Sequence, residues 1–272
     1  MRTELVSIPT PTHPLDGAYY IPDGSTKGGA MYCHGNQMNF YVGAARFLAP
    51  YLTALGYAFL AFNRRGHDSV STYNSREPVG GAYQTVAEGI EDNEIAARFL
   101  AGQGFKTPIV IGHSNGGILA SEHVARHPET PVLILLSAHA GGNRRLDPSA
   151  SRYTINEKTD ELIKQAESLI AAGKPRQLML LPTWWYVISA RTSLDRLVNV
   201  PHLIENAKRI RCPVLFVRGD QEPAANYPAE AFKKYCAGPC DIAIVPNCDH
   251  FYVGAEENIA ETVIAWLSRT LP

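Results

Sequence analysis

Short runs of apolar, often β-branched residues alternate along this chain with longer segments whose apolar residues recur at helical spacing. The short runs have the length of buried strands, and the longer segments have the length of helices. This alternation predicts a mostly parallel sheet with helices on both faces. The expected strands are Leu5–Ile8, Ala18–Ile21, Ala30–Cys33, Ala58–Phe62, Ile109–Ile111, Val132–Leu136, Val214–Val217 and Ile242–Val245.

Amphipathic segments should supply the helices that cover this sheet. Pro50 lies inside the first of them, where its missing backbone N–H should kink or break the helix. The expected helices run from Ala45 to Leu55, from Val86 to Leu100, from Gly117 to Arg126 and from Ile259 to Leu267.

One long region interrupts the alternation. Between Gly141 and Ile210 the sequence contains no convincing buried strand, whereas Thr154 and Glu157 have the spacing of a helix capping box. We therefore expect residues 141–210 to form a mainly helical insertion. An apolar stripe and a helix stop follow the capping box, formed by Leu162, Ile163, Ala166, Leu169, Ile170, Gly173 and Pro175.

Composition excludes several classes of function. The 272 residues suit one large α/β domain or a core domain with an insertion, and the net charge of −1 provides no field that attracts nucleic acid or anionic membranes. No stretch approaches the roughly 18 apolar residues of a membrane-spanning helix, and the first residues contain no apolar signal region. We expect a cytoplasmic protein with no nucleic-acid partner and no membrane insertion, and the oligomeric state is left open.

The five cysteines are odd in number and scattered. Cys236 and Cys240 have a spacing that could hold a metal ion, but no second Cys or His pair stands near them at zinc spacing. We therefore expect reduced structural thiols, and no metal or cofactor.

The stretch Gly112–Gly116 reads G-H-S-N-G and lies between an expected strand and an expected helix. This is the layout of a nucleophile elbow, in which the serine projects from a tight turn. Glycine is needed on both sides because a Cβ there would collide with the neighbouring strand and helix. Ser114 is therefore the candidate nucleophile.

A serine nucleophile needs a base within hydrogen-bond reach, and the base needs a third group that fixes its tautomer. In a parallel sheet such groups lie at the carboxyl ends of the strands. Asp220 and Glu222 follow one late strand and His250 follows the last. We predict His250 as the base and one of the two carboxylates as its partner.

The oxyanion of an acyl-transfer intermediate needs hydrogen-bond donors. The backbone amide of Asn115, at the start of the helix after the serine, is one candidate. The amide of Asn36 is the other, because Gly35 lets the loop after the third strand turn sharply. The alternative is that His34 and Gly35 form only a turn at the strand end.

Together these residues resemble the α/β-hydrolase superfamily over nearly the whole chain. The motifs that carry the resemblance are His34-Gly35, Asn63–Ser69, the elbow with its following Gly117, Gly219-Asp220-x-Glu222 and Asp249-His250-Phe251.

The resemblance implies an α/β-hydrolase fold, with an eight-stranded, mostly parallel sheet flanked by helices and a helical cap after strand 6. Residues 1–140 and 211–272 would form the core domain and residues 141–210 the cap. In the family's G-x-x-D pattern the acid stands three residues after the glycine, which assigns Glu222 and makes Asp220 the runner-up.

Other side chains have two interpretations each. His139 follows the sixth strand and could line the substrate pocket or be structural. Trp184, Trp185 and Tyr186 could line an acyl pocket beneath the cap or form the small core of the cap itself. His123 and His127 show no pattern that indicates a role.

The expected function is a serine hydrolase that cleaves a small carboxylic ester through an acyl-enzyme intermediate. Ser114 argues against dehalogenases and epoxide hydrolases, which use Asp at the elbow. An acyltransferase or a carbon–carbon bond hydrolase with the same triad stays open. A non-catalytic receptor for small ligands on a hydrolase scaffold is the alternative of another class.

Overall fold

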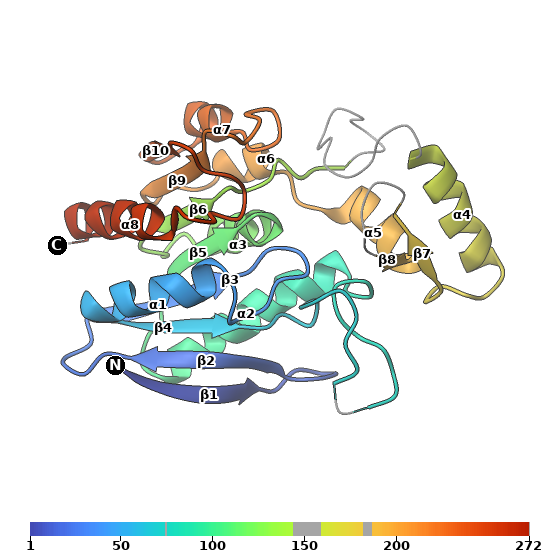
Figure 1. Ribbon diagram of the computed structural model, residues 1–272, viewed down its shortest axis with the longest axis horizontal. Coiled ribbons are helices and arrows are strands. Elements are labelled where there is room, and N and C mark those ends of the chain that lie inside the picture. Colours follow the sequence, from blue (N-terminus) through green and yellow to red (C-terminus); the bar gives the residue numbers. More distant parts are fainter. Residues whose placement is uncertain (74, 144–158, 182–186, 272) are drawn as a thin grey trace.

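A single mixed sheet organises the chain in this computed structural model, which describes residues 1–73, 75–143, 159–181 and 187–271 (Figure 1). The sheet has eight strands in the order β1-β2-β4-β3-β5-β6-β9-β10; β1 and β2 pair antiparallel, β2 pairs antiparallel with β4, and all other pairs are parallel. All eight expected strands and the mostly parallel arrangement are confirmed. The strands are β1 (Arg2–Ile8), β2 (Leu15–Ile21), β3 (Gly28–Cys33), β4 (Tyr57–Phe62), β5 (Ile109–His113), β6 (Leu133–Leu136), β9 (Val214–Gly219) and β10 (Cys240–Val245).

Helices cover both faces of the sheet, as the alternation predicts. On one face α1 (Ala44–Ala54) and α8 (Glu256–Thr270) pack against Tyr32 and its neighbours. The next residue along β3, Met31, faces the opposite cluster, because successive side chains of a strand point to opposite faces. The helices of that second face are α2 (Val86–Gly102), α3 (Asn115–Arg126), α6 (Leu203–Ala207) and α7 (Ala229–Tyr235).

Pro50 does not break its helix, so of the two outcomes expected at that point the break is wrong. Helix α1 runs continuously from Ala44 to Ala54 with Pro50 inside it. Proline removes only one backbone hydrogen bond, and the apolar side chains around it hold the helix on the sheet, with Leu48 and Leu52 fully buried.

The region between β6 and β9 is not free of strands, which corrects the sequence-based expectation. Leu178–Leu180 (β7) and Val187–Ser189 (β8) pair antiparallel and lie beside α4 (Thr159–Ala171) and α5 (Ala190–Asn199). A strand of three residues is too short to show periodicity in the sequence. Each of these strands is stabilised by its partner and by burial of its central residue.

These elements share a small hydrophobic cluster of their own, separate from the two clusters of the sheet. Its buried residues are Leu162, Ala166, Met179, Leu181, Ile188 and Ala190. By contrast, Leu203 and Ala207 of α6 are buried in a sheet cluster.

None of the five cysteines is bonded to another. Burial raises the pKa of the Cys33 thiol to about 12, so this thiol stays protonated and unreactive. Among the described residues, no helix is long and apolar enough to cross a bilayer.

Candidate active site

Ser114 lies in a strained turn between β5 and α3. Its backbone has φ 56° and ψ −123°, a left-handed value that residues with a side chain rarely adopt. A Cβ on Gly116 would lie 2.1 Å from the carbonyl oxygen of Cys33, and one on Gly112 would lie 2.6 Å from the carbonyl oxygen of Gly116. Both glycines are therefore required for the turn, as the elbow motif predicts.

The structure brings three of the predicted residues into one hydrogen-bonded chain. His250 Nε2 lies 3.0 Å from Ser114 Oγ, and His250 Nδ1 lies 2.7 Å from Glu222 Oε1. An ionised carboxylate only accepts, so His250 carries its proton on Nδ1 and presents the lone pair of Nε2 to the serine. This is the arrangement that makes a serine hydroxyl a nucleophile.

Glu222 is held by further donors. Its side chain is 3% exposed, and Oε2 accepts from the Gly219 backbone N–H at 2.8 Å and from Ser137 Oγ at 2.5 Å. Because Ser137 uses its single proton on Glu222, the Tyr252 hydroxyl donates to Ser137 Oγ at 2.6 Å. Three donors, counting His250, therefore compensate for the burial of this carboxylate.

Asp220 lies elsewhere. Its carboxylate is exposed and accepts from the Cys248 backbone N–H at 3.1 Å, which fastens the loop before His250. Backbone hydrogen bonds, first from Asn247 and then from Cys248, lower the pKa of Asp220. Of the two candidate acids, the structure brings only Glu222 to the histidine.

His113 supports the histidine loop from behind. Its Nε2 donates to the carbonyl oxygen of His250 at 2.9 Å, and its Nδ1 is buried without a hydrogen-bond partner. Burial, together with the nearby charge of His250, lowers the pKa of His113 to about 3. His113 is therefore a neutral structural donor.

The loop after β3 comes close to the serine. A Cβ on Gly35 would lie 3.2 Å from the Cβ of Ser114, so a larger residue there would crowd the serine. His34 is fully buried: its Nδ1 donates to the Gly35 carbonyl at 2.7 Å, and its Nε2 accepts from the Arg64 backbone N–H at 3.0 Å. Burial and then the charge of Arg64 lower the pKa of His34 well below the usual value, so the ring is neutral.

Arg64 supports the loop after β3, a role that the sequence did not reveal. Its guanidinium is 2% exposed and donates from Nη2 to the carbonyl oxygen of His34 at 2.7 Å. Among the described residues, no carboxylate lies within ion-pair distance of it. Its only signal in the sequence was its place in the Asn63–Ser69 motif, which does not distinguish a buried arginine from an exposed one.

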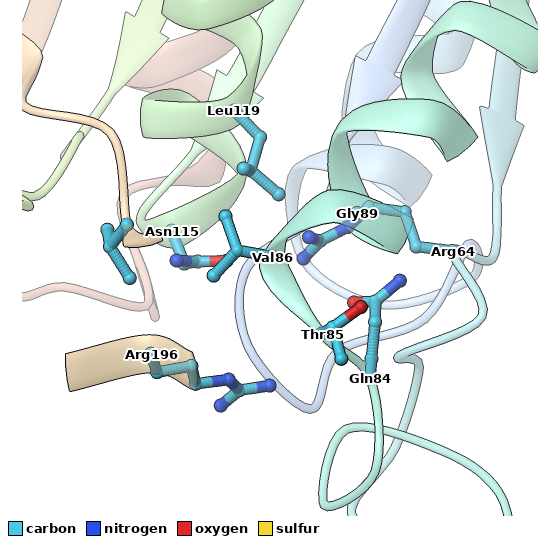
Figure 2. A pocket seen from close by; sticks show the side chains of 9 residues that line it. Arg64, Gln84, Thr85, Val86, Gly89, Asn115, Leu119 and Arg196 are labelled. Carbon is cyan, nitrogen blue, oxygen red and sulfur yellow. The ribbon is translucent and has the colours of Figure 1, made fainter. Parts of the chain in front are cut away.

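A small cavity borders the N-terminal end of α3 (Figure 2). Asn115 lies on one side of it and Arg64 on the other, and Arg196 approaches from α5. The positive charge of Arg196 also contributes to lowering the pKa of Arg64, although burial contributes most. Two arginine side chains therefore line the cavity beside the residue that follows the serine.

His139 lies next to the elbow. Its backbone N–H donates to the carbonyl oxygen of Ser114 at 3.3 Å, and its ring meets Tyr227 edge-on at 5.6 Å. Tyr227 in turn lies 4.9 Å from the His250 ring, a contact without any signal in the sequence. Trp184, Trp185 and Tyr186, the other candidate pocket residues, fall outside the described residues.

The family model described as "Alpha/beta hydrolase family" matches residues 31–263. Est1E from Butyrivibrio proteoclasticus, in a structure with ferulic acid bound, has 19% identity and a TM-score of 0.70, covering 98% of this chain and 99% of that one.

Two further structures are similar over almost their whole length. A highly thermostable carboxyl esterase from Bacillus coagulans has 15% identity and a TM-score of 0.73, with 100% of both chains covered. A monoacylglycerol lipase from Paleococcus ferrophilus has 15% identity and a TM-score of 0.66, covering 94% of this chain and 99% of that one. At these identities the likeness establishes the fold.

Proposed function

We propose that this chain, which belongs to the alpha/beta hydrolase family, is a serine hydrolase that cleaves small carboxylic esters through an acyl-enzyme intermediate. The observation that carries the proposal is the unbroken chain from Ser114 Oγ to His250 Nε2 at 3.0 Å and from His250 Nδ1 to Glu222 Oε1 at 2.7 Å. The names of the similar structures, a carboxyl esterase and a monoacylglycerol lipase, point to the same type of bond.

The reaction has two halves. His250 Nε2 takes the proton of Ser114 Oγ as the oxygen attacks the acyl carbonyl, and the imidazolium then gives that proton to the departing alkoxide. Glu222 stabilises the imidazolium through Nδ1–H. In the second half His250 takes a proton from water, which attacks the acyl-enzyme, and returns it to Ser114 as the acid leaves.

The backbone amides of Asn115 and Asn36 are the proposed donors to the oxyanion. Asn115 is the first residue of α3, where the amides and the helix dipole favour negative charge. The close approach of Gly35 to Ser114 supports a donor from the following residue. Arg64, which binds the carbonyl of His34, adds positive charge behind this loop.

We further propose that residues 141–210 act as a cap over the serine and select the substrate. Support comes from the separate hydrophobic cluster of α4, α5, β7 and β8, and from Arg196 of α5, which lines the cavity beside Asn115. His139 and Tyr227 would then form the floor of the substrate pocket next to His250.

The test is the variant Ser114→Ala, assayed with p-nitrophenyl esters of graded acyl length and with a fluorophosphonate probe. We expect the variant to fold, to lose at least about 10⁴-fold in kcat/KM and to resist labelling, because the nucleophile is gone. Ser268→Ala, which removes an exposed serine on α8, is the matched control and should behave as the parent protein. A folded Ser114→Ala variant with full esterase activity would rule out the assignment, and labelling of the parent protein without turnover would indicate a transferase or a receptor instead.

A further inference from the structure

A second cluster of ionisable side chains lies far from the serine, where α2 packs against the end of α3. His123 lies in the last turn of α3, His127 is the residue that follows this helix, and Glu94 comes from α2. Neither histidine had a predicted role. Ser114 and His127 flank opposite ends of α3, which places them about 20 Å apart along the helix axis at about 1.5 Å per residue.

The three side chains converge on one point. Glu94 Oε1 lies 2.8 Å from His123 Nδ1, and Glu94 Oε2 lies 2.8 Å from His127 Nε2. The two imidazole rings face each other with their centroids 4.3 Å apart. The three potential ligand atoms, one from each side chain, all lie within 4.8 Å of one another, and among the described residues no other set of three such groups does so.

These distances come close to those of a metal site. With bonds of about 2.0–2.1 Å, the ligand atoms of a tetrahedral zinc ion lie about 3.3 Å apart. The carboxylate and the rings would need to shift by only fractions of an ångström to about one ångström, through side-chain rotation. Two imidazoles and one carboxylate match zinc and its neighbours among the transition metals better than calcium or magnesium, which prefer oxygen ligands.

A fourth residue provides the outer support that metal-binding histidines usually have. His127 Nδ1 faces Glu129 Oε1 at 3.2 Å, on the side of the ring away from Glu94. A carboxylate on the second ring nitrogen orients the ring and makes its first nitrogen a better ligand. His123 is 5% exposed, so the packing around it keeps its ring beside Glu94.

We propose that Glu94, His123 and His127 form a binding site for one divalent transition-metal ion, best suited to zinc, that ties α2 to α3. Each imidazole binds the ion through the nitrogen that faces Glu94, and its single remaining proton sits on the other ring nitrogen, which in His127 points to Glu129. Water completes the coordination.

The experiment measures the thermal midpoint of the full chain, stripped with a chelator, with and without equimolar and tenfold ZnSO₄. We expect a rise of several degrees that saturates at one zinc per chain by equilibrium dialysis, since an ion that binds only the folded state stabilises it by mass action. CoSO₄ should produce the visible absorption band of cobalt bound by nitrogen and oxygen ligands. Ser114→Ala should keep the full zinc response, which makes this site independent of the proposed esterase.

The variants Glu94→Gln and His127→Gln should fold but lose the zinc-dependent shift. The matched control is His67→Gln, which removes a histidine–carboxylate pair of the same 2.8 Å length elsewhere in the chain and should keep the shift. Because each variant is compared with itself with and without zinc, a change in its basal stability does not obscure the result. The proposal fails if the parent protein shows no saturable shift, or if Glu94→Gln responds to zinc as the control does.

Discussion

At the scale of single residues, two carboxylates that are neighbours in sequence have opposite environments. Glu222 is buried and receives three hydrogen bonds in the site, whereas Asp220 is exposed and fastens a loop. The residues alone left both open, because either could orient an imidazole, and the resemblance to the family ranked them in this order. The difference arises from the turn after Gly219, which directs one side chain inward and the other outward.

This difference yields a prediction. Glu222→Gln should reduce kcat/KM by about 10³–10⁴-fold, because an amide NH₂ facing His250 favours the tautomer with its proton on the wrong nitrogen. Asp220→Asn, the matched control, should change kcat/KM by only a few fold, since asparagine still accepts from the Cys248 amide. Steady-state kinetics on one p-nitrophenyl ester measures both, and equal losses would reassign the acid.

The sequence located the serine and the histidine of the proposed triad better than the residues that support them. Ser114 and His250 stand directly after expected strands, where parallel-sheet topology concentrates functional groups. Ser137 and Tyr252 complete the hydrogen bonding of Glu222, yet nothing in their spacing marks them. Such contacts join loops that are distant in sequence, and only the assembled fold brings these loops together.

At the scale of elements, long periodic segments were predictable and short ones were not. All eight strands of the main sheet and the four longest helices of its flanks lie where periodicity places them, with shifted ends. The five-residue α6 and the three-residue β7 and β8 were missed because so few residues show no repeat. The helix break that Pro50 suggested is absent because burial of the surrounding helix outweighs one lost hydrogen bond.

The elbow allows a test of how tightly β5, α3 and the end of β3 are packed. Gly116→Ala should lower the free energy of unfolding by at least about 2–3 kcal/mol, because the new Cβ would lie 2.1 Å from the backbone oxygen of Cys33 and the backbone must move. Gly102→Ala, in α2, meets no atom within 4 Å and should raise that free energy by about 0.5–1 kcal/mol. Urea unfolding of both variants measures the contrast, and similar values for the two would contradict the packing described.

At the scale of the whole molecule, two buried neutral histidines connect stability to pH. The pKa of His113 is lowered to about 3, and that of His34 lies well below its usual value, both first through burial. Below pH about 6.5 the unfolded chain binds protons at these positions that the folded chain does not. The contribution of these two histidines to the free energy of unfolding is therefore fully present above this pH and is lost as the pH falls.

We expect each of these histidines to lower the free energy of unfolding by up to about 1.4 kcal/mol per pH unit as the pH falls from roughly 6.5 to 4. His113→Gln can still donate to the His250 carbonyl. In this variant the unfolding free energy should fall less steeply with pH, by the contribution of one histidine. Unfolding free energies from urea titrations at pH 7.5, 6, 5 and 4 measure both slopes. An unchanged slope in the variant would mean that His113 is protonated in the folded protein.

The connection between β6 and β9 has a consequence for how such a chain can change over time. The two strands are adjacent and in register in the sheet, although residues 137–213 separate them, and part of that connection has its own hydrophobic cluster. The entropy of closing a loop grows only with the logarithm of its length, so a twofold longer connection would cost about 0.6 kcal/mol. Insertions, deletions and replacements confined to the part with its own cluster, from α4 to α5, should leave the sheet and the serine turn intact, whereas Ser137 and α6 belong to the contacts of Glu222 and of the core.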